Sequence, residues 1–479
     1  MIGVVPHGAP GGIQVRWGAN RRTRPVTQQN RRDGRRGSAG RVDSTGAAAS
    51  RGLTRRAFLR AAAVAGAAAA APLVLPARTL GLEGTVAPSE RIVAGAIGVG
   101  GRGSSDLGWM MQEADVQLVA VCDVQKPRRD AAKKAVDAKY GNADCAVYRD
   151  MRDLLAEREN IDILLIATGD RWHTVAASLA MKAGKDVYCE KPSTMTIAEG
   201  QALVATAKRH GRVFQSGMQR RSEPLFVFAD ELARSGRLGK IHTVRAHTLP
   251  FEMKRDWLPA QPEPPRDEMD WDLWLGPAPT RPYNEGYLGG CMAWLNYYDF
   301  GTGVAGWCSH TICQCQGAID ADLTSPVAYE YPKNETAEGF TARYASGVKL
   351  VLACEGWRGS CGVRYEGTDG WVSMADGYSV PDVSSPALLE DRTKLVQEYM
   401  GKNRRPMSHM RDFLDCVRTR RQTVAHPEVA HRSMSTCHAI NISMLLKRNL
   451  TWDPAKEEFA ADAEANRMRS RALRQPWQV

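Results

Sequence analysis

A glycine-rich segment with an aspartate downstream is the first pattern in this sequence that could bind a nucleotide. Gly98, Gly100 and Gly103 stand in a G-x-G-x-x-G frame directly after an apolar run. Glycines at this spacing permit a tight turn, a close approach of backbone to a pyrophosphate, and close packing of helix on strand. Asp123 follows Gly103 by 20 residues, at the end of the next apolar run, where a carboxylate can accept hydrogen bonds from a ribose.

This pattern predicts an NAD site. Asp123 would repel a 2′-phosphate, which favours NAD over NADP, although Lys126, Arg128 and Arg129 are close enough in sequence to weaken that preference. The residues expected to contact the cofactor here are Gly98, Gly100, Gly101, Arg102, Gly103 and Asp123.

A second pattern, Cys189-Glu190-Lys191-Pro192, could supply acid–base chemistry beside that site. It follows another apolar run, and catalytic groups gather at the carboxyl edge of open α/β sheets. A lysine amine can take the proton of a secondary hydroxyl while the carbon loses a hydride. We therefore predict Lys191 as the catalytic base, whereas a solvated Glu-Lys pair would explain the same dipeptide outside this setting.

The elements that must position these groups are short apolar runs that alternate with segments of helical period. The runs cover residues 92–97, 116–122, 161–167, 187–189 and 213–215. They are too apolar for half-exposed antiparallel strands, so they predict a parallel sheet built from βαβ units. The predicted fold class is α/β, with a Rossmann domain over residues 90–217.

A different organisation is expected after that domain. Residues 218–450 predict an α+β domain with a large open, mostly antiparallel sheet that binds substrate and forms oligomer contacts. Its expected strands cover 241–247, 348–354 and 362–365, and its helices at 410–417 and 433–446 are expected to return to the Rossmann domain. Residues 451–479 are polar and predict a C-terminal arm.

With both motifs in register, the chain resembles the glucose-fructose oxidoreductase and inositol dehydrogenase family, Gfo/Idh/MocA, over about residues 90–450. The supporting segments are Thr168 with Trp172-His173, Gly184 to Val187, Ser235 to Ile241, and Trp271 to Pro277. The resemblance implies NAD or NADP as cofactor, a sugar, polyol or glycoside as substrate, and a homodimer or homotetramer. It also implies that Thr168, His173, Glu190 and Lys191 contact the cofactor, although His173 could equally cap a helix.

Members of this family usually carry a segment D-x-G-x-H-x-x-D whose aspartate and histidine flank the reacting carbon. The best match runs from Gly306 to Cys313: His310 is retained and both aspartates are replaced. The resemblance implies a catalytic role for His310, with a structural role as the alternative. Asp299 could move in to orient His310 or the substrate.

Other side chains could also contact substrate. Arg220 and Arg221 could meet it at the domain junction or form a solvated pair. Tryptophans can stack on sugar rings, but core packing explains most of them, so one or two are expected to stack among Trp257, Trp271, Trp274 and Trp307.

A metal centre is not expected. The 11 cysteines are scattered, and the densest cluster lacks a second paired-cysteine knuckle. That cluster consists of Cys308, His310, Cys313 and Cys315.

The positive charge of the chain is concentrated at its N-terminus. Residues 1–78 contain 14 Arg and two Asp and therefore carry a net charge of +12. The whole chain carries +11, so residues 79–479 carry −1. This distribution offers no electrostatic footprint for nucleic acid. No apolar run reaches the roughly 18 residues that span a bilayer.

The segment Thr54 to Arg60, followed by an Ala-rich stretch, resembles a twin-arginine export signal over residues 53–78. Residues 1–52 before it are expected to be a disordered basic extension. The expected location is therefore the periplasm or another extracytoplasmic space, and a disordered basic tail is the alternative.

The leading expectation is an enzyme that transfers a hydride between NAD and a secondary hydroxyl of a sugar, cyclitol or glycoside. One alternative keeps NAD but cleaves a glycoside through a transient keto intermediate, without net redox change. Another is a nucleotide-binding sugar sensor with weak catalysis, which the two missing aspartates favour slightly and the intact glycine loop and Lys191 oppose. Accumulation of NADH distinguishes the first from the second.

Overall fold

The computed structural model describes residues 86–479. The basic extension and twin-arginine signal expected within residues 1–78 lie outside this part of the chain. Within residues 86–479, no helix is both long and apolar enough to span a membrane.

The first domain is built on a six-stranded parallel sheet with the order β3-β2-β1-β4-β5-β6. The strands are β1 (Ile92–Ile97), β2 (Val116–Cys122), β3 (Ala146–Tyr148), β4 (Ile163–Ile166), β5 (Asp186–Cys189) and β6 (Phe214–Ser216). Strand order reverses between β1 and β4, and ligands bind at the carboxyl edge of such a switch point. The expected Rossmann architecture is confirmed.

Helices connect these strands, as a parallel sheet requires. They are α2 (Gly101–Met110), α3 (Lys126–Tyr140), α4 (Met151–Glu157), α5 (Asp170–Lys182) and α6 (Ile197–His210). Helix α5 is buried on nearly every side, because its alanines let neighbouring elements approach closely.

The second domain contains a nine-stranded sheet with the order β13-β12-β11-β7-β10-β9-β8-β14-β15. Its strands are β7 (Ile241–His247), β8 (Ala328–Glu330), β9 (Thr341–Arg343), β10 (Lys349–Ala353), β11 (Val363–Gly367), β12 (Trp371–Met374), β13 (Asp382–Val383), β14 (Leu450–Asp453) and β15 (Glu458–Phe459). Only β7 and β10 pair in parallel, so the sheet is mostly antiparallel, as expected.

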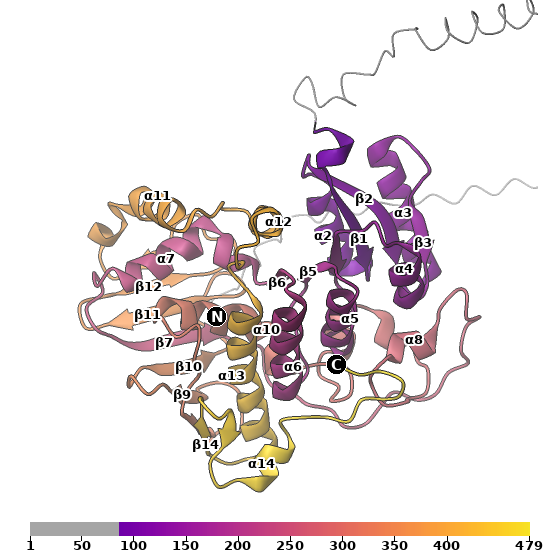
Figure 1. Ribbon diagram of the computed structural model, residues 1–479. Coiled ribbons are helices and arrows are strands. Elements are labelled where there is room, and N and C mark those ends of the chain that lie inside the picture. The colour runs from indigo at the N-terminus through magenta and orange to yellow at the C-terminus, as the bar shows by residue number, and fades with distance from the viewer. Residues whose placement is uncertain (1–85) are drawn as a thin grey trace, which may run out of the picture. The chain divides into compact units, whose positions relative to one another are not determined.

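Helices link the two domains. Helix α10 (Val304–Ala318) packs on β7, α13 (Pro427–Leu446) packs on α10, and α6 of the first domain packs on α13 (Figure 1). Helix α12 (His409–Thr419) inserts Phe413 and Leu414 into the core beside β1 and β2. These contacts hold α10 at the edge of the Rossmann sheet.

The remaining long helices of the second domain are α7 (Pro224–Arg234) and α11 (Arg392–Asn403), which pack on each other.

The chain between β7 and α10 forms what we call the connecting segment, residues 249–303. It contains α8 (Trp271–Leu275), the 3₁₀ helix η4 (Glu285–Leu288) and α9 (Cys291–Trp294). Its aromatic core includes Trp271 and Trp274, which stack with ring centroids 4.5 Å apart. The segment docks on the Rossmann domain, where the amide of Lys126 donates to the Glu268 carbonyl (2.9 Å).

The residues expected to form a C-terminal arm are largely structured. They contribute β14 and β15 to the nine-stranded sheet, followed by α14 (Ala463–Arg467). The chain then runs to α5, where Trp477 is buried and its ring packs edge-on against Trp172 at 4.6 Å. This segment is polar overall, but apolar side chains such as Trp452 and Phe459 lie between its polar ones and pack into the core.

Candidate active site

The glycine-rich loop connects β1 to α2 and has no room for side chains. Gly98 has φ of +80°, and a Cβ there would lie 2.7 Å from the Ala167 carbonyl carbon. A Cβ at Gly103 would lie 1.9 Å from the Gly98 carbonyl oxygen. The backbone is therefore bare where a pyrophosphate would meet the start of α2, which fits a dinucleotide.

Asp123, at the end of β2, is fixed by backbone donors. Its Oδ2 accepts from the Val99 amide (3.0 Å) and its Oδ1 from the Gln125 amide (2.9 Å). Burial raises the pKa of Asp123, while the Gln125 amide and the charge of Arg128 oppose that rise. Each oxygen keeps an acceptor site free for a ribose hydroxyl.

A cavity of about 180 Å³ opens over this loop. The Rossmann domain lines it on one side and the connecting segment on the other, with Asp123, Thr168, Arg171, Trp274, Leu288 and Trp294 among the lining residues. The volume is below the roughly 300–1,000 Å³ of ordinary ligand pockets, so a dinucleotide must extend beyond it along the loop.

Only one of the three basic residues after Asp123 faces this cavity. Lys126 pairs with Asp130 at the surface (2.6 Å). Arg129 is buried and donates to the Asp123 carbonyl (2.7 Å). Arg128 lines the cavity and lies over Gly100, where a Cβ would be 2.5 Å from its Cδ.

Two residues expected at the cofactor differ in their placement. Thr168 lines the cavity. The ring nitrogens of His173 instead contact the backbone carbonyls of Pro192 (2.7 Å) and Thr168 (3.1 Å). His173 therefore joins the ends of β4 and β5 and positions both loops.

Arg102 stands between two buried carboxyl groups. Its Nε lies 3.0 Å from Asp106 Oδ1 and 3.4 Å from Glu190 Oε1, and Gln219 donates to Glu190 Oε1 (2.5 Å). Asp106 is fully buried, and neither of its oxygens has a well-aligned hydrogen-bond donor. Burial and the charge of Glu190 raise the pKa of Asp106, and Arg102 offsets this only in part. Asp106 therefore keeps its proton to a higher pH than an exposed aspartate does.

This pair predicts a pH-dependent stability. Because the pKa of Asp106 is higher in the folded state than its usual 3.8, the folded protein holds a proton that the unfolded chain has lost above about pH 4. The free energy of unfolding should therefore fall as pH rises from about 4 until the folded group ionises. Urea denaturation between pH 5 and 8 should show a smaller fall in the free energy of unfolding for Asp106→Asn, and an unchanged slope would contradict the raised pKa of Asp106.

The second motif reaches across to the second domain. Lys191 Nζ donates to the Gly306 carbonyl oxygen on α10 (3.0 Å). One turn further along α10, His310 Nε2 lies 3.2 Å from Arg220 Nη1. Arg220 is held in turn by both oxygens of Asp376 (3.0 and 2.5 Å). The structure thus brings Lys191, His310 and Arg220 to one place between the domains.

The protonation state of His310 follows from these neighbours. Burial lowers the pKa of His310 well below 6.5, and the charges of Lys191 and Arg220 lower it further. Arginine only donates hydrogen bonds, so Nε2 of a neutral His310 accepts and Nδ1 carries the proton. Nδ1 is buried without a partner among residues 86–479. His310 therefore offers a donor and not a base.

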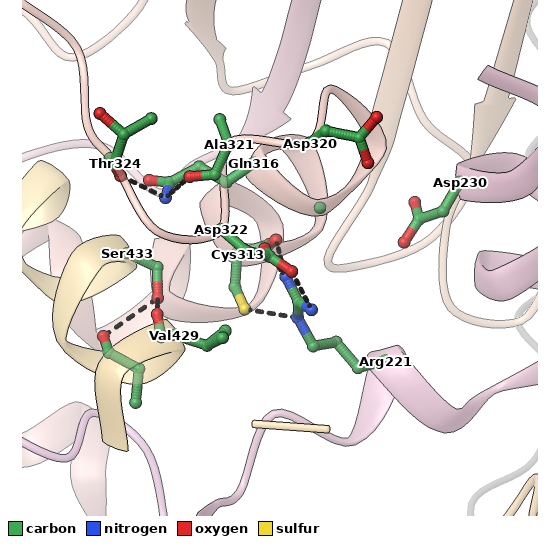
Figure 2. A network of polar contacts seen from close by, with 12 residues as sticks. Arg221, Asp230, Cys313, Gln316, Asp320, Ala321, Asp322, Thr324, Val429 and Ser433 are labelled. Atoms are coloured by element: carbon green, nitrogen blue, oxygen red, sulfur yellow. Dashed lines mark hydrogen bonds and ion pairs between the residues drawn. The ribbon is translucent and has the colours of Figure 1, made fainter. Parts of the chain in front are cut away.

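The structure accounts for the two replaced aspartates. A Cβ at Gly306 would lie 2.0 Å from Leu295 Cδ1, so the connecting segment fills the space of a side chain there. Cys313 faces Arg221, whose Nε lies 2.9 Å from Sγ and which also pairs with Asp322 (Figure 2). Burial raises the pKa of the Cys313 thiol, with Arg221 opposing.

Asp299 is not brought to His310. Its carboxylate pairs with Arg281 (2.7 Å), and it lines a separate cavity beside Leu473. Arg220 takes the place next to His310, because the 3₁₀ helix that follows β6 points it at α10. The expectation that Asp299 orients His310 is therefore wrong, because Arg220 contacts His310 and Asp299 pairs with Arg281.

An aromatic group beside His310 was found by the structure and not by sequence reasoning. The His247 ring packs between Trp357 (5.3 Å, stacked) and Trp307 (6.0 Å, edge-on). His247 Nδ1 and Trp307 Nε1 are buried and lack partners among residues 86–479. A cavity of about 280 Å³ adjoins Trp307. The sequence singles out only Trp307 of this group, because no motif contains His247 or Trp357.

The other tryptophans have different surroundings. Trp271 and Trp274 belong to the core of the connecting segment, while Trp257 is 51% exposed and lies under Arg281. In the part of the chain that the structure describes, no group of three or more His, Cys, Asp or Glu side chains could hold a metal.

Known proteins share this architecture. The aldose-aldose oxidoreductase of Caulobacter crescentus is 16% identical, with TM-score 0.50 and coverage of 75% of this chain and 99% of that one. The apo scyllo-inositol dehydrogenase of Lactobacillus casei is 16% identical, with TM-score 0.51 and coverage of 76% and 98%. These likenesses show a common fold.

Curated relatives match shorter stretches. The inositol 2-dehydrogenase of Salmonella typhimurium is 32% identical over 151 residues, which cover 31% of this chain and 43% of that protein. A glycosyl hydrolase family 109 protein of Saccharopolyspora erythraea is 35% identical over 174 residues, covering 33% and 38%. The chain thus spans less than half the length of these relatives.

Two family descriptions cover most of the described residues. Residues 92–218 match the oxidoreductase family with an NAD-binding Rossmann fold, and residues 231–479 match the C-terminal alpha/beta domain of the same family. With the glycine loop, the lysine at the end of β5 and both sheets in place, the chain belongs to the Gfo/Idh/MocA oxidoreductase family.

Proposed function

We propose that this protein oxidises a secondary hydroxyl of a sugar, cyclitol or glycoside to a ketone, reversibly and with NAD as cofactor. One observation carries the proposal: Lys191 leaves the cofactor sheet and meets α10 beside His310 and Arg220. The relatives named inositol 2-dehydrogenase support the substrate class.

Lys191, His310 and Arg220 have separate roles in this proposed reaction. NAD held along the glycine-rich loop supplies the hydride acceptor. The Lys191 amine takes the hydroxyl proton, and the Gly306 carbonyl orients that amine. His310 Nδ1–H donates to the substrate oxygen and Arg220 fixes His310 in this tautomer. The two carboxyl positions that relatives use here are not required in this scheme.

The aromatic group supports a carbohydrate substrate. Sugar rings present an apolar face to aromatic rings and hydroxyls at their edges. Trp307 borders a cavity of about 280 Å³ and offers such a ring, with Trp307 Nε1 and His247 Nδ1, unpaired within residues 86–479, buried beside it.

Glycoside cleavage through a transient keto intermediate is a second candidate. Relatives named glycosyl hydrolase family 109 proteins favour it. The connecting segment also covers the cofactor cavity, which suits a cofactor that is reduced and reoxidised without leaving.

The leader and the family resemblance support two further parts of the proposal. Thr54 to Arg60 resembles a twin-arginine signal, so we propose that the enzyme acts outside the cytoplasm, where free NAD is scarce and a retained cofactor is useful. We also propose a homodimer or homotetramer, by analogy with the family.

The test is to denature the purified protein and identify any released nucleotide by mass spectrometry and absorbance, then to screen sugars and glycosides. Stoichiometric NAD or NADH is expected. NADH accumulation with a sugar supports the dehydrogenase, and cleavage without accumulation supports the second candidate. No nucleotide, together with no saturable NAD or NADP binding, would overturn the proposal.

A further inference from the structure

Arg171 is a buried cation whose charge no residue of the described chain neutralises by direct contact. It lies in the first turn of α5, directly after the end of β4, and only 5% of its surface is exposed. It lines the cofactor cavity together with Thr168 and Gly169, and it also borders the separate cavity beside Leu473. None of the expected motifs assigns it a role.

An aromatic cage holds the guanidinium. Its Cζ lies 3.5 Å from the ring centroid of Trp274, 5.7 Å from that of Trp294 and 5.6 Å from that of Phe300. Its Nε donates to the Trp274 carbonyl (2.7 Å). All of these partners belong to the connecting segment, so Arg171 is a main contact between that segment and α5.

The cage does not replace a counter-ion. The neighbouring carboxylate, Asp170, accepts instead from the amide (3.1 Å) and hydroxyl (2.7 Å) of Thr302. No ion pair of Arg171 occurs within residues 86–479, and its Nη1 is buried without a hydrogen-bond partner there. Burial lowers the pKa of the Arg171 guanidinium. A buried cation without a paired anion destabilises the folded protein, and a bound anion that pairs with it removes much of this cost.

Gly169 shows that the chain makes room for this guanidinium. Its φ of −82° and ψ of 157° are open to any residue, so glycine is not needed for conformation. A Cβ there would lie 2.4 Å from Arg171 Nη1. The missing side chain therefore lets Nη1 lie against backbone that lines the cofactor cavity.

We propose that Arg171 binds a phosphate group of the dinucleotide, with Nη1 as donor. The inference rests on the proposed NAD-dependent function. Guanidinium matches phosphate oxygens in charge and geometry, and the glycine-rich loop brings its amides to the same cavity. Because the same guanidinium holds Trp274, phosphate binding also favours the docked connecting segment.

The test compares Arg171→Gln with the wild-type protein after bound nucleotide is removed. Calorimetric titrations use NAD, ADP-ribose, NADP and adenosine, the last as a phosphate-free probe. Loss of one charge-assisted hydrogen bond, about 1.5–3 kcal/mol, corresponds to a loss of about tenfold to a hundredfold in affinity. We expect that loss for NAD and ADP-ribose and an unchanged affinity for adenosine, which identifies the pyrophosphate.

A loss confined to NADP would identify a 2′-phosphate as the bound group instead. The matched control is Arg471→Gln, because Arg471 also donates to a carbonyl of the connecting segment and lies over Tyr298 (3.8 Å) but does not line this cavity. Arg471→Gln should leave all four affinities unchanged. If Arg171→Gln fails to fold, Gly169→Ala displaces the guanidinium and should give the same selective loss.

Two results overturn the inference while the proposed function stands: wild-type affinity for every ligand in Arg171→Gln, or an equal loss for adenosine and NAD. A wild-type protein that binds none of the four ligands overturns the proposed function itself.

Discussion

Lys191→Ala is expected to lower kcat by about a hundredfold to ten-thousandfold, the range for loss of a positioned acid–base group. The amine would be missing from the site beside His310 while the glycine-rich loop remains intact. Affinity for NAD should therefore change little. Steady-state kinetics on a substrate found by the sugar screen, with NAD titration in parallel, measures both quantities.

Lys182→Ala is the matched control, because Lys182 is exposed in the last turn of α5, away from the end of β5. It should retain wild-type kcat. A Lys191→Ala enzyme that keeps more than about a tenth of wild-type kcat would remove Lys191 from the role of base.

Gly103→Ala is expected to abolish NAD binding and to destabilise the fold by about 1–3 kcal/mol, the cost of overpacking a tight site. The added methyl group would lie 1.9 Å from the Gly98 carbonyl oxygen, so the loop must move away from α2. Urea denaturation and NAD titration measure the two effects.

Gly108→Ala tests whether the effect belongs to the loop. Gly108 lies in the same helix, and a Cβ there would meet nothing within 4 Å. Because alanine is the better helix former, this variant should gain up to about 1 kcal/mol and bind NAD normally. Normal NAD binding by Gly103→Ala would show that the loop tolerates a side chain and would count against the dinucleotide site.

Much of the Rossmann domain could be predicted from sequence, because buried parallel strands are continuous apolar runs. Strands β1 and β2 have the predicted bounds. Strand β3 (Ala146–Tyr148) was missed although its residues are apolar; it is a three-residue strand at the edge of the sheet and is half exposed. In the second domain β7 was predicted fully, while short strands such as β13 were not.

The sequence predicted only those site residues that belong to a local sequence motif. The glycine loop, Asp123 and the lysine motif each depend on neighbours in sequence. Asp376 and Trp357 reach the site through strand pairing in the nine-stranded sheet, so no local pattern identifies them. Arg171 is visible as a site residue only once the connecting segment is seen to close over α5.

The contact between Trp477 and Trp172 ties a segment far away in sequence to the wall of the cofactor cavity. Arg474 also donates to the Gly276 carbonyl (2.8 Å), so the last stretch of sequence braces both α5 and the connecting segment. Helix α5 and the connecting segment both line the cofactor cavity, so residues far from the glycine-rich loop in sequence support its walls without lining it.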